Sequence, residues 1–278
     1  MIPTSRLFTF LDEKSGFAFH ILEGQKLIND LAIIHELKAH QFSFFRDTVL
    51  ATQPLISFLK KGEGLGFYLD SKDPSYTFKI ETHFNGKMRT LFISDEFDSP
   101  LTKVNAIVRL AKVLPNAKHP YTSTLSSDGK NLEEIVNTIL KDSYQISARI
   151  HISQSSDQSI LIMRLPELNV DKSVLSERVS LDEYWPLHLK VFNDFFQLGE
   201  TSEKAIIRFF EQRNFLYLQN KEVKFECPCG RQRMIHGLQG LYNSDPLSLF
   251  DEGKDELEVK CDYCNTYYQI LKSELAPN

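Results

Sequence analysis

The stretch VKFECPCGRQRM, residues 223–234, separates a long segment without cysteine from a short one that holds every cysteine of the chain. In chain order these residues are Cys227, Cys229, Cys261 and Cys264. A segment as short as 227–278 rarely buries enough apolar surface to fold alone, and it usually needs a disulfide or a metal as a staple. The stretch therefore predicts a separate C-terminal domain, residues 227–278, held together by its cysteines.

The spacing of the cysteines is typical of a zinc site. The first pair flanks one residue, Pro228, and the second lies in VKCDYCNTYYQI, residues 259–270, with two residues between its members. Four thiolates complete a tetrahedral shell around Zn2+, and a C-x-x-C segment suits a tight turn in which Asn265 tolerates the left-handed conformation. We therefore expect one zinc ion bound by the four cysteines. His236, seven residues after Cys229, is close enough in sequence to substitute for a cysteine, but four thiolates already complete the shell.

The composition is that of a globular protein: of 278 residues, 42% are hydrophobic and 25% are charged, and the net charge is −5. No run reaches the ~20 apolar residues of a membrane-spanning helix, and the N-terminal sequence has neither the basic leader nor the apolar core of an export signal. We therefore expect a cytoplasmic protein that does not enter a membrane. Because the C-terminal domain has five basic and eight acidic residues, we do not expect it to bind nucleic acid.

Residues 1–170 predict a mixed α/β domain with an antiparallel sheet. Phe17, Phe19 and Ile21 alternate as in a strand, and the Asn85–Gly86 pair predicts a hairpin. A second hairpin is expected around the polar loop QSSDQ, residues 154–158, and helices are expected over 25–37, 44–59 and 131–143. With the segments that follow, the predicted class is α+β: an N-terminal α/β domain, a helical linker and a small zinc domain with four cysteine ligands.

Residues 171–226 are interpreted as an amphipathic helical linker. One helix is expected over 187–198, ending at Gly199, and another after the N-cap residue Thr201. The apolar faces of these helices carry Phe192, Phe195, Phe196, Phe209 and Phe210. If the linker leaves the surface on which it packs, these rings form an apolar patch that can bind unfolded chains. The alternative is that they are permanent core.

The same cysteines support a redox hypothesis. Accessible thiolates react with oxidants, and each pair is close enough in sequence to close its own disulfide. A disulfide is a far poorer ligand than two thiolates, and metal binding in so small a domain is coupled to its folding. Oxidation would therefore release the metal and unfold the domain.

The chain resembles the heat shock protein 33 family of redox-regulated chaperones, whose signature is the arrangement C-x-C followed by C-x-x-C. The stretch EKAIIRFFEQRNFLYLQNKEVKFECPCGRQRM, residues 203–234, is similar to the segment that leads into the family's zinc domain. HPYTSTLSSDGKNLEEIVNTILKDSYQISARI, residues 119–150, is similar to its central section. The chain departs from the family at Gly230 and in NAIVRLAKV, residues 105–113, which bears on client preference and activation threshold but leaves the cysteines intact.

The resemblance implies a holdase chaperone that needs no ATP and is not an enzyme. It implies that the reduced, zinc-bound form is inactive, and that oxidation forms the disulfides Cys227–Cys229 and Cys261–Cys264 and releases zinc. The linker and zinc domain then unfold, and the exposed apolar surface binds unfolding client proteins. Active members of the family dimerise, so the resemblance also implies a homodimer in the oxidised state.

Two alternatives stay open from the sequence. One is a zinc-ribbon interaction module, associated with nucleic acid or the ribosome, whose metal is only structural; the other is a family member that binds zinc but has lost the switch. No catalytic motif competes with these hypotheses. HELKAH, residues 35–40, lacks the second histidine that a zincin helix needs at Ala39, and KKGEGLG, residues 60–66, lacks the ending of a phosphate-binding loop.

Overall fold

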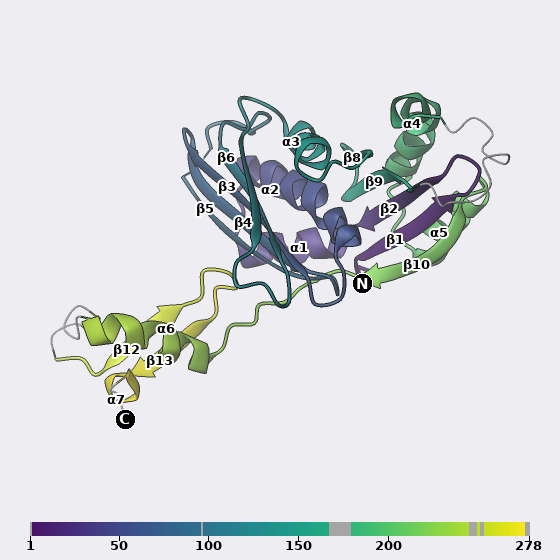
Figure 1. Cartoon of the computed structure of the whole chain (residues 1–278). Coiled ribbons are helices and arrows are strands. Elements are labelled where there is room, and N and C mark those ends of the chain that lie inside the picture. The colour runs from purple at the N-terminus through teal and green to yellow at the C-terminus, as the bar shows by residue number, and fades with distance from the viewer. Residues whose placement is uncertain (1, 96, 167–178, 245–248, 251–252, 276–278) are drawn as a thin grey trace. The chain divides into compact units, whose positions relative to one another are not determined.

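The computed structural model of the chain describes residues 2–95, 97–166, 179–244, 249–250 and 253–275 (Figure 1). The chain forms two compact units, Met1–Phe225 and Glu226–Asn278. Both contain helices and antiparallel strands, which confirms the predicted α+β class. The expected boundary between residues 170 and 171 lies outside the described residues.

The first sheet of the larger unit has five antiparallel strands (Figure 1). In spatial order they are β10 (Leu216–Glu222), β1 (Arg6–Asp12), β2 (Phe17–Glu23), β9 (Gln158–Arg164) and β8 (Ala148–Ile152). Every residue of β2 is buried because apolar clusters cover both faces: Phe17, Phe19 and Ile21 belong to one cluster and Leu22 to the other. This alternation confirms the predicted strand, and the pairing of β8 with β9 confirms the hairpin around 154–158.

The second sheet has six strands. In spatial order they are β11 (Lys224–Phe225), β5 (Lys87–Ser94), β4 (Ser75–His83), β3 (Gly64–Lys72), β6 (Ile107–Val113) and β7 (Tyr121–Ser126). β11 runs parallel to β5, and the other neighbours are antiparallel. Gly86 has a φ of 87° in the turn between β4 and β5, which confirms the predicted hairpin, because glycine adopts positive φ without steric cost.

Helices join the two sheets through one shared core. They are α1 (Gln25–Ile34), α2 (Ala39–Thr52), the 3-10 turn η1 (Gln53–Phe58), α3 (Leu132–Thr138) and the π-helical turn η2 (Ile139–Ser143). The helix expected over 25–37 ends early, and Glu36 beyond it has a φ of 49°. The helix expected over 44–59 begins earlier and ends at Thr52, where η1 follows; Pro54, the second residue of η1, has no N–H to continue the α-helix.

Two helices of the segment 179–225 cover the outer face of the first sheet: α4 (Leu181–Leu198) and α5 (Glu203–Glu211). α4 begins at Leu181 instead of 187, because Ser180 and Glu183 cap each other's backbone N–H groups. It ends as predicted at Gly199, which has a φ of 57°. The N-cap of α5 is Ser202, one residue after the one expected. β10 and β11 follow, so this segment contributes strands to both sheets as well as helices.

The smaller unit consists of α6 (Arg231–Ser244), β12 (Glu256–Lys260), β13 (Tyr267–Leu271) and the single turn α7 (Lys272–Leu275). β12 and β13 form an antiparallel pair in which Val259 lies opposite Tyr268. The buried residues of its apolar cluster are Ile235, Phe250, Ile270 and Leu275. A core of this size supports the expectation that the unit needs a staple.

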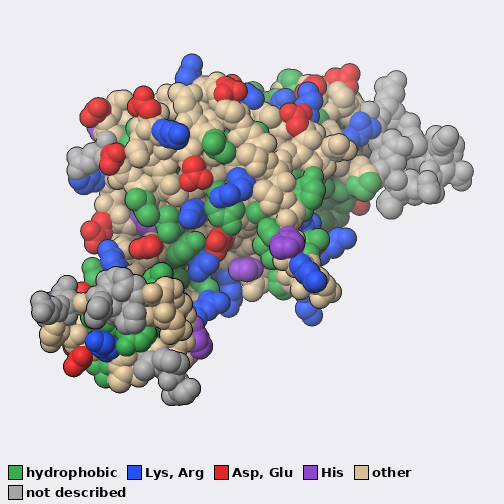
Figure 2. Space-filling model, turned by 60° about the vertical axis from the view of Figure 1, so that its left-hand side comes forward, with side chains coloured by type: hydrophobic (Ala, Val, Ile, Leu, Met, Phe, Trp, Pro, Cys, Tyr) green, Lys and Arg blue, Asp and Glu red, His purple; other side chains and the backbone are tan. Residues whose placement is uncertain are grey.

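Within the described part of the chain, no helix combines the length and the apolar character that crossing a bilayer requires. Even α4, with 18 residues, carries four charged side chains: Asp182, Glu183, Lys190 and Asp194. On the face of the larger unit that Figure 2 shows, acidic and basic side chains are intermingled, without a continuous block of either sign.

Candidate metal centre

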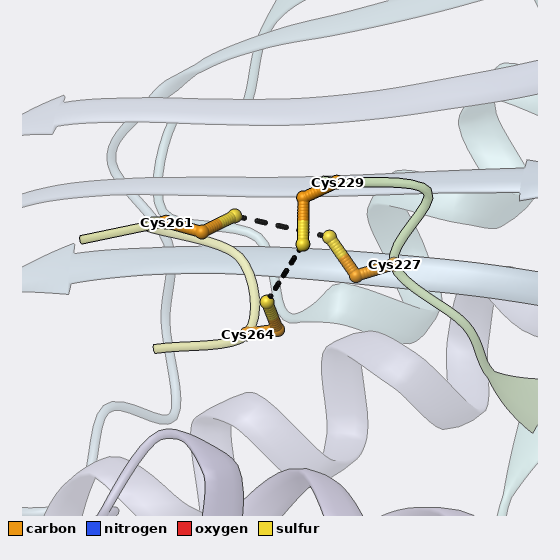
Figure 3. A group of neighbouring side chains, drawn as sticks. All are labelled: Cys227, Cys229, Cys261 and Cys264. Carbon is orange, nitrogen blue, oxygen red and sulfur yellow. Dashed lines mark hydrogen bonds between the residues drawn. The ribbon is translucent and has the colours of Figure 1, made fainter. Parts of the chain in front are cut away.

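Two short loops bring the four cysteines together (Figure 3). The first follows β11 and carries the C-x-C pair, and the second is the turn between β12 and β13, which carries the C-x-x-C pair. In that turn the backbone N–H of Asn265 donates to the carbonyl of Cys261 at 2.8 Å, and the N–H of Cys261 donates to the carbonyl of Thr266 at 2.9 Å. Asn265 has a φ of 57°, which confirms the expected left-handed residue after the second cysteine.

The four sulfurs form a tight cluster in which all ligand atoms lie within 4.8 Å of one another. The sulfur of Cys227 lies 3.8 Å from that of Cys261, and the sulfur of Cys229 lies 3.2 Å from that of Cys264 (Figure 3). A tetrahedral Zn2+ with Zn–S bonds of ~2.3 Å places its sulfurs about 3.8 Å apart. In size and in donor type the cluster therefore fits one four-coordinate ion that is bound by both loops.

In the absence of a metal, the thiols of Cys227, Cys261 and Cys264 differ in pKa. Burial raises the pKa of Cys227 to about 12, and burial also raises the pKa of Cys261. For Cys264 burial acts in the same sense, but hydrogen bonds, chiefly those with the hydroxyl and the backbone N–H of Thr266, outweigh it and lower the pKa to about 7. A divalent cation at the centre of the cluster would deprotonate all four thiols together, because a metal ligand must be a thiolate.

The first turn of α6 anchors the loops to the rest of the unit. Arg231 forms an ion pair with Glu274 of α7 and donates to the carbonyl of Gln269 on β13 at 3.0 Å. Arg233 donates to the carbonyl of Pro228, between the two cysteines of the first loop, at 2.7 Å. These contacts connect the C-x-C loop to the strand that leaves the C-x-x-C loop, so the two halves of the ligand set are held by one scaffold.

Two hydroxyl groups that the sequence analysis does not single out also lie against the sulfurs. The hydroxyl oxygen of Tyr268 is 3.1 Å from the sulfur of Cys229, and that of Thr266 is 3.2 Å from the sulfur of Cys264. The sequence does carry a signal for these two residues: Thr266 and Tyr268 are two positions apart, so their side chains lie on the same side of an extended chain.

The histidines that the sequence analysis weighed stand apart from the cluster. His236 is exposed and is not part of the four-residue group. His35 directly follows α1, and its ring nitrogen Nε2 is 2.7 Å from the hydroxyl of Thr90, whereas His40 lies in the first turn of α2. Burial lowers the pKa of His35 to about 4. In the described residues these histidines form no metal-binding group: His35 is half-buried against the ring of Phe45, whereas His40 is exposed.

The five linker phenylalanines lie on the first sheet, in the larger unit. Phe192, Phe195, Phe196 and Phe210 are buried, and Phe209 is partly buried against them. The ring of Phe210 is 5.0 Å from that of Phe10 on β1, and the ring of Phe192 is 5.6 Å from that of Phe19 on β2. In this conformation they form a core shared by the linker and the sheet.

The turn between α4 and α5 is held by the loop between β8 and β9. The hydroxyl of Ser155 donates to the carbonyl of Phe196 at 3.1 Å, and the amide of Gln158 donates to the carbonyl of Glu200 at 2.7 Å. The hydroxyl of Ser156 donates to the side-chain oxygen of Gln158 at 2.9 Å, which turns the amide nitrogen toward the linker. Sequence reasoning recognised this loop only as polar, because its partners are about forty residues away in the chain.

The fold and the cluster define a class: an α+β protein of two units, whose small C-terminal unit is built around four clustered cysteines. Comparisons with known proteins identify the family within this class. The family model described as Hsp33 protein matches residues 5–271, so the chain belongs to the Hsp33 family.

Individual relatives agree with this assignment. The "33 kDa chaperonin" of Nitrosococcus oceani is 22% identical over 280 residues, which cover 97% of this chain and 92% of that protein. The "33 kDa chaperonin" of Clostridium perfringens is 32% identical over 77 residues, so the match spans only 28% of this chain and 24% of that protein. The solved structure of the 33 kDa chaperonin from Thermotoga maritima superimposes with a TM-score of 0.74 over 98% of this chain and 97% of that one; at 14% identity it supports the fold.

Proposed function

We propose that this protein is a redox-regulated holdase chaperone. In its reduced form one Zn2+ is bound by Cys227, Cys229, Cys261 and Cys264, and the chaperone is inactive. Oxidation releases the zinc, unfolds the smaller unit and the linker, and exposes apolar surface that binds unfolding proteins without ATP. The observation that carries the proposal is the cluster of four sulfurs within 4.8 Å, in a chain that belongs to the Hsp33 family. Few other described residues of the smaller unit are buried.

The donor set and the size of the core support the zinc part of the proposal. Zn2+ prefers thiolates in tetrahedral structural sites, and binding of such an ion contributes about 10–16 kcal/mol in small zinc domains. By comparison, fully burying one large apolar side chain contributes only about 1.5–3 kcal/mol. The metal would therefore be the largest single contribution to the stability of this unit, and its loss would unfold the unit.

The oxidation step uses hydrogen peroxide or a comparable two-electron oxidant. One thiolate attacks a peroxide oxygen, so that an S–O bond forms, the O–O bond breaks and hydroxide leaves. The neighbouring thiolate then attacks this sulfenic acid, an S–S bond forms and a second hydroxide leaves. Each disulfide thus consumes one peroxide and two protons and yields two waters. We propose the pairs Cys227–Cys229 and Cys261–Cys264, which leave no thiolate for the metal.

The buried aromatic face of the linker supports the client-binding part. Phe192, Phe195, Phe196, Phe209 and Phe210 are the residues that undocking would expose. Aromatic rings each bury about 150–250 Å2, so five of them form a patch larger than monomers normally expose. The linker strand β11 ends at Phe225, with only Glu226 before Cys227, so unfolding at the first cysteine begins next to the linker.

The remaining parts of the proposal concern surroundings and partners. We propose a cytoplasmic protein, whose thiols stay reduced until oxidative stress, and a homodimer in the oxidised state. We propose that it does not bind nucleic acid, because residues 227–278 carry five basic and eight acidic residues, and zinc-bound thiolates add negative charge. We also propose that it has no enzymatic activity.

The test treats the reduced, zinc-loaded protein with peroxide at elevated temperature. We expect one zinc per chain to be released and the aggregation of an unfolding client to be suppressed, while the reduced protein has no effect. A variant with all four cysteines replaced by serine is the control for oxidation elsewhere. Zinc release without any suppression of aggregation would contradict the chaperone function and leave an interaction module with a structural zinc. Thiols that stay unreactive would identify a family member without the switch.

A further inference from the structure

One hydrogen bond at the cluster connects the two cysteine loops through a side chain. Tyr268 belongs to β13, which leaves the C-x-x-C loop, whereas its hydroxyl lies 3.1 Å from the sulfur of Cys229 in the C-x-C loop. A metal-bound thiolate has no proton to donate, so in the metal-bound form Tyr268 is the donor. Within the C-x-x-C loop the thiol of Cys264 donates to the hydroxyl of Thr266 at 3.2 Å; a metal-bound Cys264 thiolate can only accept, so in the metal-bound form this hydroxyl too is the donor.

The position of Tyr268 is fixed by the strand. It lies opposite Val259 on β12 and packs against the apolar cluster of the unit, on the side where Ile270 is fully buried. Its neighbour Tyr267 points to the other side and is 58% exposed. The ring of Tyr268 is therefore held by packing, and its hydroxyl has a defined direction toward Cys229.

We propose that Tyr268 is a positioning residue of the cysteine switch, which orients the sulfur of Cys229 on the metal and slows its oxidation. A hydrogen bond to a thiolate removes electron density from the sulfur, and the sulfur must supply the electron pair for the S–O bond when it attacks peroxide. Outer partners of metal ligands also fix their geometry, and their loss typically weakens metal binding about 10–100-fold. This inference rests on the proposed function, because it concerns the oxidation of the same cysteines.

As a consequence, the rates at which the two disulfides form depend on different hydroxyl groups. The Tyr268 hydroxyl restrains the pair Cys227–Cys229, while the Thr266 hydroxyl restrains the pair Cys261–Cys264. The peroxide, electron and proton balance of each disulfide is unchanged; only the rate at which the first S–O bond forms differs. Removing one hydroxyl should therefore accelerate one pair selectively.

The experiment compares Tyr268→Phe with Tyr267→Phe, a matched control that removes a hydroxyl from the exposed neighbour and keeps both rings. Zinc-loaded proteins are treated with hydrogen peroxide, and the two disulfides are quantified over time by trapping and mass spectrometry. For Tyr268→Phe we expect Cys227–Cys229 to form about tenfold faster, as loss of one hydrogen bond to a charged group implies, and Cys261–Cys264 to change much less. Thr266→Val should show the reverse preference.

A second measurement needs neither oxidant nor client. Competition with a chromogenic chelator should show zinc bound about tenfold more weakly by Tyr268→Phe and unchanged by Tyr267→Phe, in line with a lost outer-shell contact. Equal acceleration of both disulfides would mean that the substitution merely loosens the unit, and unchanged kinetics and affinity would mean that the hydroxyl has no role; either result overturns the proposal. If the parent protein resists peroxide altogether, the proposed function fails, and the chelator measurement still decides whether Tyr268 orients Cys229.

Discussion

At the scale of single residues, the proposed function requires the same four sulfur atoms to serve two chemical states. As thiolates they can share a cation from two loops, and the contacts of 3.8 Å and 3.2 Å between sulfurs of different loops match that state. As disulfides they would join within each loop, which separates the halves of the site. The inter-loop distances favour the thiolate state, so under the proposed function the loops have to rearrange before each disulfide closes.

Replacing one ligand tests the first state. Cys264→Ser replaces a thiolate by a hydroxyl that is a poor Zn2+ ligand, so we expect zinc affinity to fall by at least about 100-fold and the smaller unit to lose its fixed structure. Zinc content and chelator competition measure the affinity. Ser273→Ala, at an exposed position of the same unit, is the control and should bind zinc like the parent protein. Unchanged affinity in Cys264→Ser would remove this cysteine from the ligand set.

A second prediction at this scale concerns acid stability. His20 is buried on β2, where its Nδ1 lies 3.2 Å from the hydroxyl of Thr9; burial and, to a lesser extent, the charge of Lys221 lower its pKa from 6.5 to about 4. The unfolded chain therefore protonates the His20 ring more readily than the folded protein does. The contribution of neutral His20 is present above pH 6.5 and is lost as the pH falls through about 4, by a total on the order of 3 kcal/mol.

Urea unfolding followed by the fluorescence of Trp185, at pH 7 and pH 5, measures this effect. We expect His20→Gln to lose less stability between the two pH values than the parent protein does. Exposed His119→Gln should behave like the parent. Glu23 acts in the opposite sense, since burial raises its pKa to about 7 and its contribution is lost as the pH rises through that value. Glu23 is present in the parent protein and in both variants, so its contribution cancels in the comparison. If the stability of His20→Gln depended on pH as that of the parent does, a role for His20 would be excluded.

At the scale of elements, the important contact is the docking of α4 and α5 on the first sheet. It combines an aromatic core with a few directed hydrogen bonds from the loop between β8 and β9. That loop is itself fixed to α2, because Arg46 binds Asp157 at 2.7 Å and the carbonyl of Ser153 at 2.8 Å. The linker thus packs against a loop that is fixed to α2, which suits the proposed role of the linker as a segment that stays docked until the smaller unit unfolds.

Gln158→Ala removes the hydrogen bond to the carbonyl of Glu200. We expect the docked linker to lose about 1 kcal/mol, a typical value for one such bond, and hydrogen exchange in the turn between α4 and α5 to become about fivefold faster. Exchange in β4, on the other sheet, should not change. Gln154→Ala, an exposed glutamine of the same loop, is the matched control. Equal exchange in both variants would show that the aromatic core alone holds the linker.

At the scale of the whole molecule, the chain divides into a large unit with extensive apolar cores and a small one in which few of the described side chains are buried. Removing zinc with a chelator under reducing conditions should therefore make residues 226–278 sensitive to protease first. The six-stranded sheet should stay resistant, because its core does not involve the metal. Mass spectrometry of the fragments locates the cuts, and adding zinc back should restore resistance. Early cuts within β3 or β4 would show that the units do not lose structure separately.

The sequence predicted well those turns and helix ends that depend on one or two neighbouring residues. The hairpin at Asn85–Gly86, the end of α4 at Gly199 and the left-handed Asn265 each follow from the steric preferences of one or two residues. It predicted the start of α4 less well, because the capping pair of Ser180 and Glu183 lies before the apolar pattern. It also did not predict that the segment after α5 forms strands, since β10 and β11 depend on partners near residues 6 and 87.

By itself, the sequence determined the candidate ligand set and the reason for it: four thiolates at these spacings suit a metal, and a unit of this size usually needs a metal or a disulfide to fold. It also indicated the aromatic face of the linker. Only the tertiary structure decided that the sulfurs meet within 4.8 Å, that the phenylalanines lie on β1 and β2, and that Tyr268 reaches the sulfur of Cys229. The physical reason is that spacing along the chain sets which residues can be neighbours in a turn, whereas distances between loops depend on the packing of the elements that carry them.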